Sequence, residues 1–433
     1  MMRVFSLTVF AAVLLIPSLN AFGELRFPPP EFESGYEFPQ TTDPASQSVA
    51  YEYLDAAVLV VALLLASYLI LKRRSRRAIF GLMIFSLLYF GSWRKGCICP
   101  IGAIQNMTLT VFDSGYAIPI SAAIFFVAPL VAALFWGRVF CGAVCPLGAI
   151  QDAVLIHPIK VPRWLESALR LMAYTYLGAG VLFAATGAAF IICRYDPFIG
   201  FFRLSGNWNV LILGTSLLLI GLFVGRPYCR FLCPYGILLR HLSVLSKRRV
   251  TITPTECIKC RLCEDACPFG AINEPTEDWP EGEYRIAKKR LAFFLVLLPI
   301  LVGAAGWAGY ALKGPLARMH PSVRAAERVY LEETGQVEGT TDVSDAFRAT
   351  GRPAEDLYAE AAQLHERFSL GGALLGGFLG LVLGGQFLAL SVRRRRTEYE
   401  ADPASCLACG RCYQYCPKEH ERLKRSEKAV AGT

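Results

Sequence analysis

Two cysteine-rich runs carry the most specific chemistry in this chain. The first run is Cys257-Ile-Lys-Cys260-Arg-Leu-Cys263-Glu-Asp-Ala-Cys267-Pro268, and the second is Cys406-Leu-Ala-Cys409-Gly-Arg-Cys412-Tyr-Gln-Tyr-Cys416-Pro417. In each run, three cysteines stand at two-residue gaps, and a fourth follows after three residues and precedes a proline. This spacing is typical of thiolate ligands for [4Fe–4S] clusters. Zinc ribbons use separate C-x-x-C pairs instead, so the runs predict iron–sulfur chemistry.

The fourth cysteine of such a run ligates the other cluster when two clusters share one domain. This rule predicts that the two runs exchange their last ligands. We expect cluster A to take Cys257, Cys260, Cys263 and Cys416, and cluster B to take Cys406, Cys409, Cys412 and Cys267. Two stretches that are distant in the sequence must therefore fold together as one two-cluster domain.

The composition is that of a membrane protein. Of the 433 residues, 54% are hydrophobic and only 18% are charged, whereas soluble domains carry about 25% charged residues. The chain is too large for a small secreted domain held by disulfides, and eight of its 15 cysteines lie in the two runs, which indicates a reducing compartment there. The net charge of +9 does not indicate nucleic-acid binding, because the basic residues cluster at the ends of apolar segments.

Apolar segments predict a polytopic α-helical membrane protein with about seven helices. Most of these segments approach the ~20 residues that are needed to cross a bilayer, although the second is short. The expected helices lie near residues 55–72, 78–92, 117–137, 168–192, 208–226, 291–312 and 370–391. A split, bacterial-type two-cluster ferredoxin domain completes the predicted fold.

Basic runs near residues 72–77, 247–249, 288–290 and 393–396 predict the orientation, because such runs stay on the cytoplasmic side of the bacterial inner membrane. Both halves of the ferredoxin domain then face the cytoplasm. An amino-terminal signal segment precedes the first helix. The expected parts are a signal segment (1–23), a Pro-rich extracytoplasmic segment (24–54), membrane helices with Cys-Pro turns (55–240), the first ferredoxin half (241–290), a membrane helix (291–312), a helical extracytoplasmic insert (313–369), a membrane helix (370–392) and the second ferredoxin half (393–433).

A Cys-Pro turn recurs three times ahead of an apolar run, at Cys99-Pro100, Cys145-Pro146 and Cys233-Pro234. Proline suits the first turn of a helix. The preceding cysteine would lie near free backbone N–H groups and the positive end of the helix dipole, which favour a thiolate ligand. The second and third turns have a further cysteine four residues earlier. We therefore predict a third iron–sulfur cluster at cytoplasmic helix ends, and the alternative is buried structural cysteines. Its ligands would be Cys141, Cys145, Cys229 and Cys233.

The remaining cysteines, Cys97, Cys99 and Cys193, fall on the outer side in this topology. They could form an outer redox site, either as a Cys97–Cys99 disulfide or as three ligands of an outward-facing cofactor. Unreactive buried thiols are the alternative. If the short segment 78–92 is not a full crossing, Cys97 and Cys99 would lie deeper in the bundle and join an intramembrane cluster.

Cysteine–proline turns at membrane-helix ends, together with the paired cysteine runs, resemble the membrane polyferredoxins. This family includes the regulatory and electron-donor protein of nitrous-oxide reductase and the membrane quinol-dehydrogenase ferredoxin of periplasmic nitrate reductase. The resemblance covers roughly residues 78–275 and 400–418. It implies electron transfer between cytoplasmic clusters or quinol and an extracytoplasmic redox partner. The chain differs from the family in lacking the flavin-binding domain of the nitrous-oxide relative and in having the additional turn at Cys97 and Cys99.

The sequence thus predicts an electron-transfer component of an oxidoreductase system rather than a stand-alone enzyme, with cysteines that act as ligands and not as acid–base catalysts. Two [4Fe–4S] clusters and a third iron–sulfur cluster are the expected cofactors, and quinone is a further candidate. The expected partners are a cytoplasmic electron donor or quinol, and a flavoprotein or reductase outside the cytoplasm; nucleic acid is not expected. Two alternatives remain open: a quinol or quinone oxidoreductase subunit, and a redox-sensing or maturation factor for a partner metalloenzyme.

Overall fold

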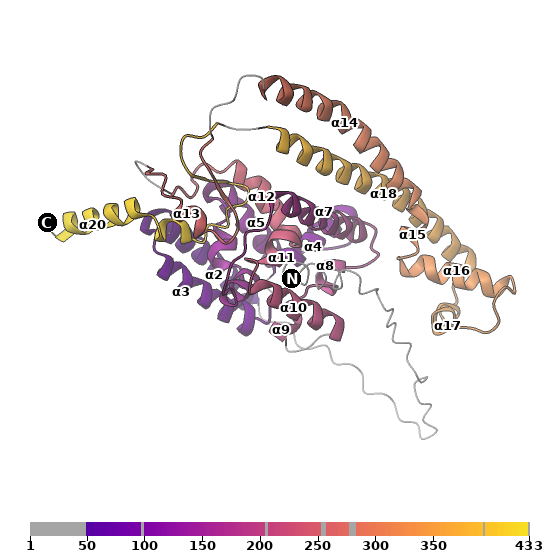
Figure 1. The fold of residues 1–433 in the computed structure, drawn as a ribbon. Helices are drawn as coiled ribbons and strands as arrows, with labels where there is room; N and C mark the ends of the chain where they lie inside the picture. Colours follow the sequence, from indigo (N-terminus) through magenta and orange to yellow (C-terminus); the bar gives the residue numbers. More distant parts are fainter. Residues whose placement is uncertain are drawn as a thin grey trace.

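The computed structural model describes residues 49–96, 99–203, 207–252, 257–276, 283–392 and 395–431. These residues are mostly helical (Figure 1). The predicted signal segment, most of the Pro-rich segment and Cys97 lie outside the described residues.

Short helices and three π-helical turns (η1–η3) alternate with longer helices in the first part of the chain. The elements up to residue 244 are α2 (Val49–Tyr68), η1 (Leu69–Arg73), α3 (Arg76–Ser86), η2 (Leu87–Trp93), α4 (Pro100–Phe112), α5 (Ile120–Trp136), η3 (Phe140–Val144), α6 (Pro146–Ala153), α7 (Arg163–Ala185), α8 (Ile191–Arg194), α9 (Ile199–Arg203), α10 (Trp208–Gly221), α11 (Pro227–Phe231) and α12 (Pro234–Val244). The later elements are α13 (Leu262–Asp265), β1 (Ile272–Asn273), α14 (Glu283–Ala311), α15 (Lys313–Ala317), α16 (Pro321–Glu333), α17 (Asp342–Ala349), α18 (Ala354–Ser391), β2 (Glu400–Ala401), α19 (Arg411–Gln414) and α20 (Pro417–Ala431).

All seven predicted apolar segments contain helix, but they differ in length. Among the described residues, four helical segments are long and apolar enough to cross a membrane: Ala50–Arg73, Arg163–Ala185, Arg285–Ala311 and Ala354–Ser391. Helices α5 and α10 are apolar but shorter. The short segment near 78–92 forms α3 and then continues as η2.

Several helix ends differ from the sequence-based expectation, including α14, which begins at Glu283 rather than near residue 291, and α10, which ends at Gly221 rather than near residue 226. Helix α7 ends at Ala185 rather than near residue 192, because Gly187 takes a φ of +72°, a conformation that suits glycine. Helix α18 begins at Ala354 and runs for 38 residues, so the last membrane helix is continuous with the preceding part of the insert.

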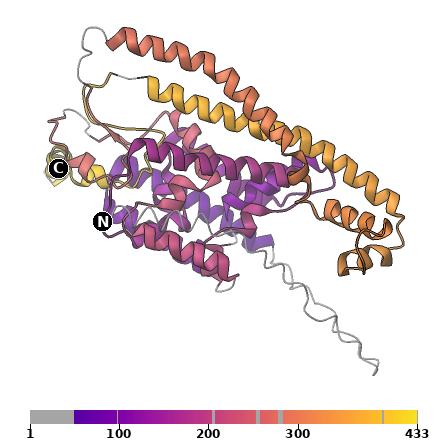
Figure 2. The same ribbon diagram turned by 45° about the vertical axis from the view of Figure 1, so that its right-hand side comes forward.

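Helices α14 and α18 form an antiparallel pair, with α18 against α7 and the short helices α15–α17 at the end far from α13 and α20 (Figures 1 and 2). Glycines make the close approach possible. A Cβ added at Gly372 would lie 2.5 Å from the carbonyl oxygen of Gly309, and one at Gly380 would lie 2.9 Å from the Cα of Val302. Small residues at such a crossing are typical of packed membrane helices.

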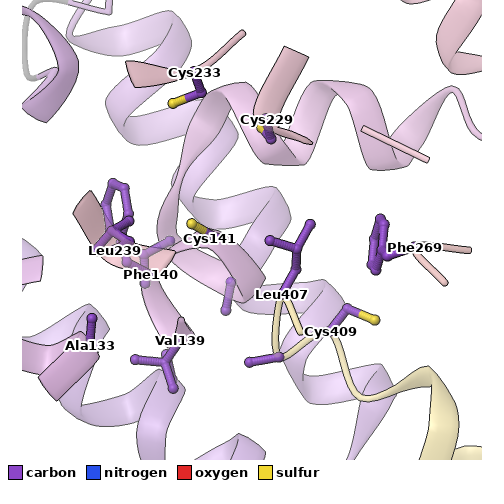
Figure 3. Packing of buried hydrophobic residues seen from close by; sticks show 14 of the residues in the cluster. Ala133, Val139, Phe140, Cys141, Cys229, Cys233, Leu239, Phe269, Leu407 and Cys409 are labelled. Atoms are coloured by element: carbon purple, nitrogen blue, oxygen red, sulfur yellow. The ribbon is translucent and has the colours of Figure 1, made fainter. Parts of the chain in front are cut away.

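One apolar core joins the membrane helices to both cysteine runs. Its buried residues include Cys141 and Tyr228 from the helical part, Phe269 and Ile272 after the first run, and Leu407 in the second run. Figure 3 shows Leu407 and Cys409 beside Cys141 in this core. The ferredoxin halves are therefore packed into the helical body rather than tethered to it by linkers.

A buried carboxylate, Asp152 in α6, organises this junction. Its side chain is fully buried and pairs with Arg76 at 2.7 Å, Arg411 at 3.3 Å and Arg226 at 3.5 Å. Arg76 also donates a hydrogen bond to the carbonyl oxygen of Cys409 at 2.9 Å. Burial raises the pKa of Asp152, but the charges of Arg226, Arg411 and Arg76 outweigh that effect and lower it to about 2. Asp152 is therefore ionised at neutral pH and links three segments of the chain.

Replacing Asp152 by asparagine should destabilise the protein strongly, because three arginines would lose their shared counter-charge inside the core. We expect the free energy of unfolding to fall by about 3–5 kcal/mol, the usual cost of removing one partner of a buried ion pair. Denaturant unfolding of the full chain in detergent measures this loss.

Asp265 provides the matched control, because it pairs with Lys160 at 3.1 Å while its side chain remains 65% exposed. Asp265→Asn should cost about 0–1 kcal/mol. Equal losses for the two variants would show that Asp152 does not hold the junction.

Candidate iron–sulfur sites

The two cysteine runs meet through a short antiparallel strand pair. Strand β1, which follows the first run, pairs with β2, which precedes the second run, with Ile272 opposite Ala401 and Asn273 opposite Glu400. The backbone N–H of Asp402 also donates to the carbonyl oxygen of Ala271 at 2.8 Å. These contacts make one unit of two segments that are separated by the α14–α18 helices.

One cavity of about 280 Å³ is lined by the four thiols that the exchange rule assigns to cluster A. They are Cys257, Cys260, Cys263 and Cys416. Ile252, Ile258 and Tyr399 complete the lining. Burial raises the pKa of Cys263 to about 11, so its thiol is protonated at neutral pH when no metal is bound. A cluster would therefore displace protons as it binds.

The four cysteines assigned to cluster B also lie together. Burial, followed by the charges of Cys406, Cys409 and Cys267, raises the pKa of Cys412 well above its usual value. Burial likewise raises the pKa of Cys406 to about 12, with Cys409 and Cys267 among the interacting groups. The structure thus brings Cys267 of the first run to the three closely spaced cysteines of the second run.

The backbone of the two runs follows the same path around the second cysteine. Lys259 and Arg261, on either side of Cys260, both have positive φ angles of 54° and 65°. In the second run, Ala408 and Gly410 flank Cys409 with φ angles of 53° and 78°. Turns of this kind direct successive N–H groups into one concavity, which suits an anionic cluster.

The donor set fits a cluster better than a single ion. Across the described ranges, no three Cys, His, Asp or Glu side chains converge closely enough to hold one metal ion. The thiolates of a cubane bind different iron atoms, so they stand further apart than the ligands of one ion. Both sites also present four cysteine sulfur donors, as is typical of [4Fe–4S] clusters.

A second cavity lies at the helix ends and is lined by five cysteines. They are Cys99, Cys141, Cys145, Cys229 and Cys233. The four cysteines predicted for a third cluster therefore share one cavity with Cys99, an arrangement that agrees with the alternative in which Cys99 lies within the helical bundle. Cys193 does not line this cavity but lies against α4, where a Cβ added at Gly102 would be 2.9 Å from its Sγ atom.

Local geometry matches the expectation for Cys-Pro turns. Cys145 and Cys233 are the N-cap residues of α6 and α12, each followed by proline in the first turn. The backbone N–H of Gly236 donates to the Cys233 Sγ atom at 3.3 Å. The N-terminus of α12 thus directs a backbone donor at the Cys233 sulfur atom, whereas Cys145 caps α6 without a side-chain cap hydrogen bond.

Three polar residues around this cavity were not assigned by the sequence analysis. Gln151 donates to the Cys229 Sγ atom at 3.3 Å, and Arg138 donates to the Cys141 Sγ atom at 3.7 Å. Arg226 is fully buried and donates to the carbonyl oxygen of Cys141. The repeat that ends in Gln151 was visible in the sequence, but nothing there indicated that its amide contacts a sulfur atom.

The second run packs directly on the Cys141 turn. A Cβ added at Gly142 would lie 2.7 Å from the carbonyl oxygens of both Leu407 and Ala408. Only glycine therefore allows the loop around Cys406 and Cys409 to approach η3 this closely. The cysteines of the cluster B site and those of the helix-end cavity belong to neighbouring, touching segments.

Comparison with known proteins gives matches over the same cysteines. One family profile described as "4Fe-4S binding domain" matches residues 118–163 and 207–253, which contain Cys141, Cys145, Cys229 and Cys233. Another profile of the same description matches residues 250–273, which contain the first run. No solved structure matches the chain.

Relatives match over part of the chain. The "Putative electron transport protein YccM" of Escherichia coli is 34% identical over 25% of this chain and 33% of its own length. Protein NirI of Paracoccus denitrificans is 32% identical over 27% of this chain and 18% of its own length. An uncharacterised protein of Methanocaldococcus jannaschii is 29% identical over 24% of this chain and 44% of its own length. The chain thus spans less than half the length of each of these relatives.

If each run supplies its fourth cysteine to the other cluster, EPR spectra of cysteine variants will show which thiols share a cluster. Cys416→Ala should remove the same EPR signal as Cys257→Ala, because both thiols line the cluster A cavity. Cys267→Ala should instead remove the signal that Cys406→Ala removes. EPR of the reduced full chain measures this pairing. Loss of one signal by both Cys416→Ala and Cys406→Ala would contradict the exchange.

Proposed function

We propose that this chain, a polyferredoxin-like iron–sulfur protein with 4Fe–4S binding domains, conducts electrons across a membrane. The cysteines of the two ferredoxin halves would hold two clusters and the helix-end cysteines a third, and together these clusters would supply one-electron chemistry toward a redox partner on the other side. The observation that carries this proposal is the contact at Gly142, where the second run touches the Cys141 turn. It makes the cysteine sites a connected series rather than separate structural centres.

The clusters, when bound, supply one-electron redox chemistry, and the chain supplies ligands, shielding and charge. Arg226 contributes to the shielding and to the charge, but it is not a ligand. Its guanidinium is fully buried, contacts the carbonyl oxygen of Cys141 and lies 5.7 Å from the centre of the Phe269 ring. A buried positive charge at this position would stabilise the reduced, more negative form of a cluster held by Cys141 and its neighbours. Arg226 would therefore raise the reduction potential of the helix-end cluster.

The charges at one end of the helices support a cytoplasmic position for the ferredoxin halves. Arg74, just after the first span, donates to the carbonyl oxygen of Thr251 at 2.8 Å and pairs with Glu419 at 2.7 Å. Arg76 contacts the second run at Cys409. Basic residues next to membrane spans stay in the cytoplasm of bacteria. Helices α15–α17, at the opposite end of the α14–α18 pair, would then face outward (Figure 1).

Removing the helix-end cluster should interrupt this path. Cys145→Ala should lower the iron content by about four atoms per chain, while the signals of clusters A and B remain. Electron transfer from a reduced soluble ferredoxin outside proteoliposomes to ferricyanide trapped inside should be lost. Undiminished transfer at the lower iron content would overturn the proposed path.

The Gly142 contact can be tested separately. Gly142→Ala should push the second run away from η3 and slow the oxidation of cluster B by an acceptor on the far side. Gly81→Ala is the matched control, because an added Cβ there has nothing within 4 Å. Stopped-flow spectroscopy of the reduced chain compares the two rates. Equal rates in both variants would mean that electrons do not use this contact.

A specific hydrogen bond favours quinol oxidation as a second candidate function. The Tyr174 hydroxyl and the His241 Nε2 atom lie 2.9 Å apart, between α7 and α12. The neighbouring Arg240 donates to the Ser405 Oγ atom at 3.1 Å, next to the second run. A histidine–tyrosine pair close to a cluster can accept protons as a quinol releases electrons. Reduction of the clusters by a quinol analogue in the wild-type chain, and the loss of this reduction in His241→Phe, would support this function. If the quinol analogue does not reduce the clusters, this function is excluded.

A further inference from the structure

The first Cys-Pro turn has the same local structure as the other two. Cys99 is the N-cap residue of α4 and is followed by Pro100 in the first turn, as Cys145 and Cys233 are followed by proline in α6 and α12. The first turn differs in one respect, because Lys95 occupies the position four residues before Cys99. Cys141 and Cys229 occupy that position in the other two turns.

The second turn shows how such a turn holds a cysteine from another segment. Gln151, six residues after Cys145, accepts a hydrogen bond at Oε1 from the backbone N–H of Tyr228 at 3.0 Å. Its Nε2 atom donates to the Sγ atom of the adjacent Cys229 at 3.3 Å. One amide thus holds the backbone of Tyr228 and the sulfur atom of the next residue, Cys229, which faces the helix-end cavity.

Gln105 occupies the same position after Cys99 and performs the first of these two functions. Its Oε1 atom accepts a hydrogen bond from the backbone N–H of Cys193 at 3.2 Å. The Sγ atom of Cys193 lies beside Gly102, in the first turns of α4. Cys193 therefore contacts the Cys99 turn through both its backbone N–H and its sulfur atom, whereas two consecutive residues, Tyr228 and Cys229, contact Gln151 after the Cys145 turn.

Among the described residues, the amide nitrogen of Gln105 does not donate to a sulfur atom as that of Gln151 does. Gln105 is fully buried, and its Nε2 atom has no hydrogen-bond partner within the described part of the chain. The hydroxyl of the buried Tyr228 also lacks a partner there. An unpaired buried donor costs roughly 1–3 kcal/mol. Sulfide or thiolate acceptors beside Cys193 would satisfy the Gln105 donor, as the Cys229 sulfur satisfies Gln151.

We propose that Cys99 and Cys193 ligate an additional iron–sulfur centre next to the helix-end site. Asp196 is available as a further ligand, because its carboxylate is buried and lines the same cavity as Cys99. The inference rests on the proposed function, since it adds a centre to the same series of redox sites. It changes the role of Cys193 from an isolated thiol to a ligand held by Gln105.

Thiol labelling of the wild-type full chain tests this assignment without a substitution. Cys193 and Cys260 are both exposed in the structure. In anaerobically purified, iron-loaded protein, both should resist N-ethylmaleimide, and both should react after the iron is removed by acid and a chelator. Mass spectrometry identifies the labelled cysteines. Immediate labelling of Cys193 while Cys260 stays protected would overturn the proposal.

Variants give an independent measurement. Cys193→Ala should lower the iron and acid-labile sulfide content by about two to four atoms of each per chain, and should leave the EPR signals of clusters A and B unchanged. Gly102→Ala should have the same effect, because its new Cβ would lie 2.9 Å from the Cys193 sulfur. Gly81→Ala should retain full iron.

The comparison with Cys145→Ala separates this inference from the proposed function. If Cys145→Ala loses iron while Cys193→Ala does not, the additional centre is excluded and the helix-end cluster stands. If neither variant loses iron, both centres are excluded. Loss of iron in both variants, with Cys193 protected in the wild-type protein, supports both.

Discussion

A single buried negative charge holds the redox-active part of this molecule together. Asp152 lies on α6, directly after a Cys-Pro turn, and pairs with arginines from α3, from the start of α11 and from α19. Three positive charges inside an apolar core would repel one another without it. Because Arg411 belongs to the second cysteine run, the same carboxylate that stabilises the helical body also fixes where the cluster B ligands lie.

This junction explains why a ferredoxin-like unit can be split by two membrane-length helices. Strands β1 and β2 are only two residues each and could not hold the halves together alone. Leu407 and the loop around Cys409 instead pack into the core beside Cys141. The helical body thus supports the loops of both cysteine runs, and the loops in turn close one end of that body.

The spacing of the cysteines was enough to predict which thiols gather at each ferredoxin site, because ligand geometry constrains local spacing strongly. It also predicted that Cys145 and Cys233 begin helices. The depth of Cys99 could not be predicted, because it depends on whether residues 78–92 cross the bilayer, and a short apolar segment does not decide this. The roles of Gln105, Gln151 and Arg226 were invisible for another reason: each contacts a residue that is far away in the sequence.

Because β1 pairs with β2, the two cysteine runs can come together only after the chain between them has been synthesised. Residues 257–267 leave the ribosome long before residues 406–416, and α14, α15–α17 and α18 are made in between. The pocket that Cys257, Cys260 and Cys263 share with Cys416 is therefore complete only when nearly the whole chain has been made. The four helix-end cysteines all lie between residues 141 and 233, so that site would be ready for its cofactor first, and a chain truncated before residue 406 would be partly loaded.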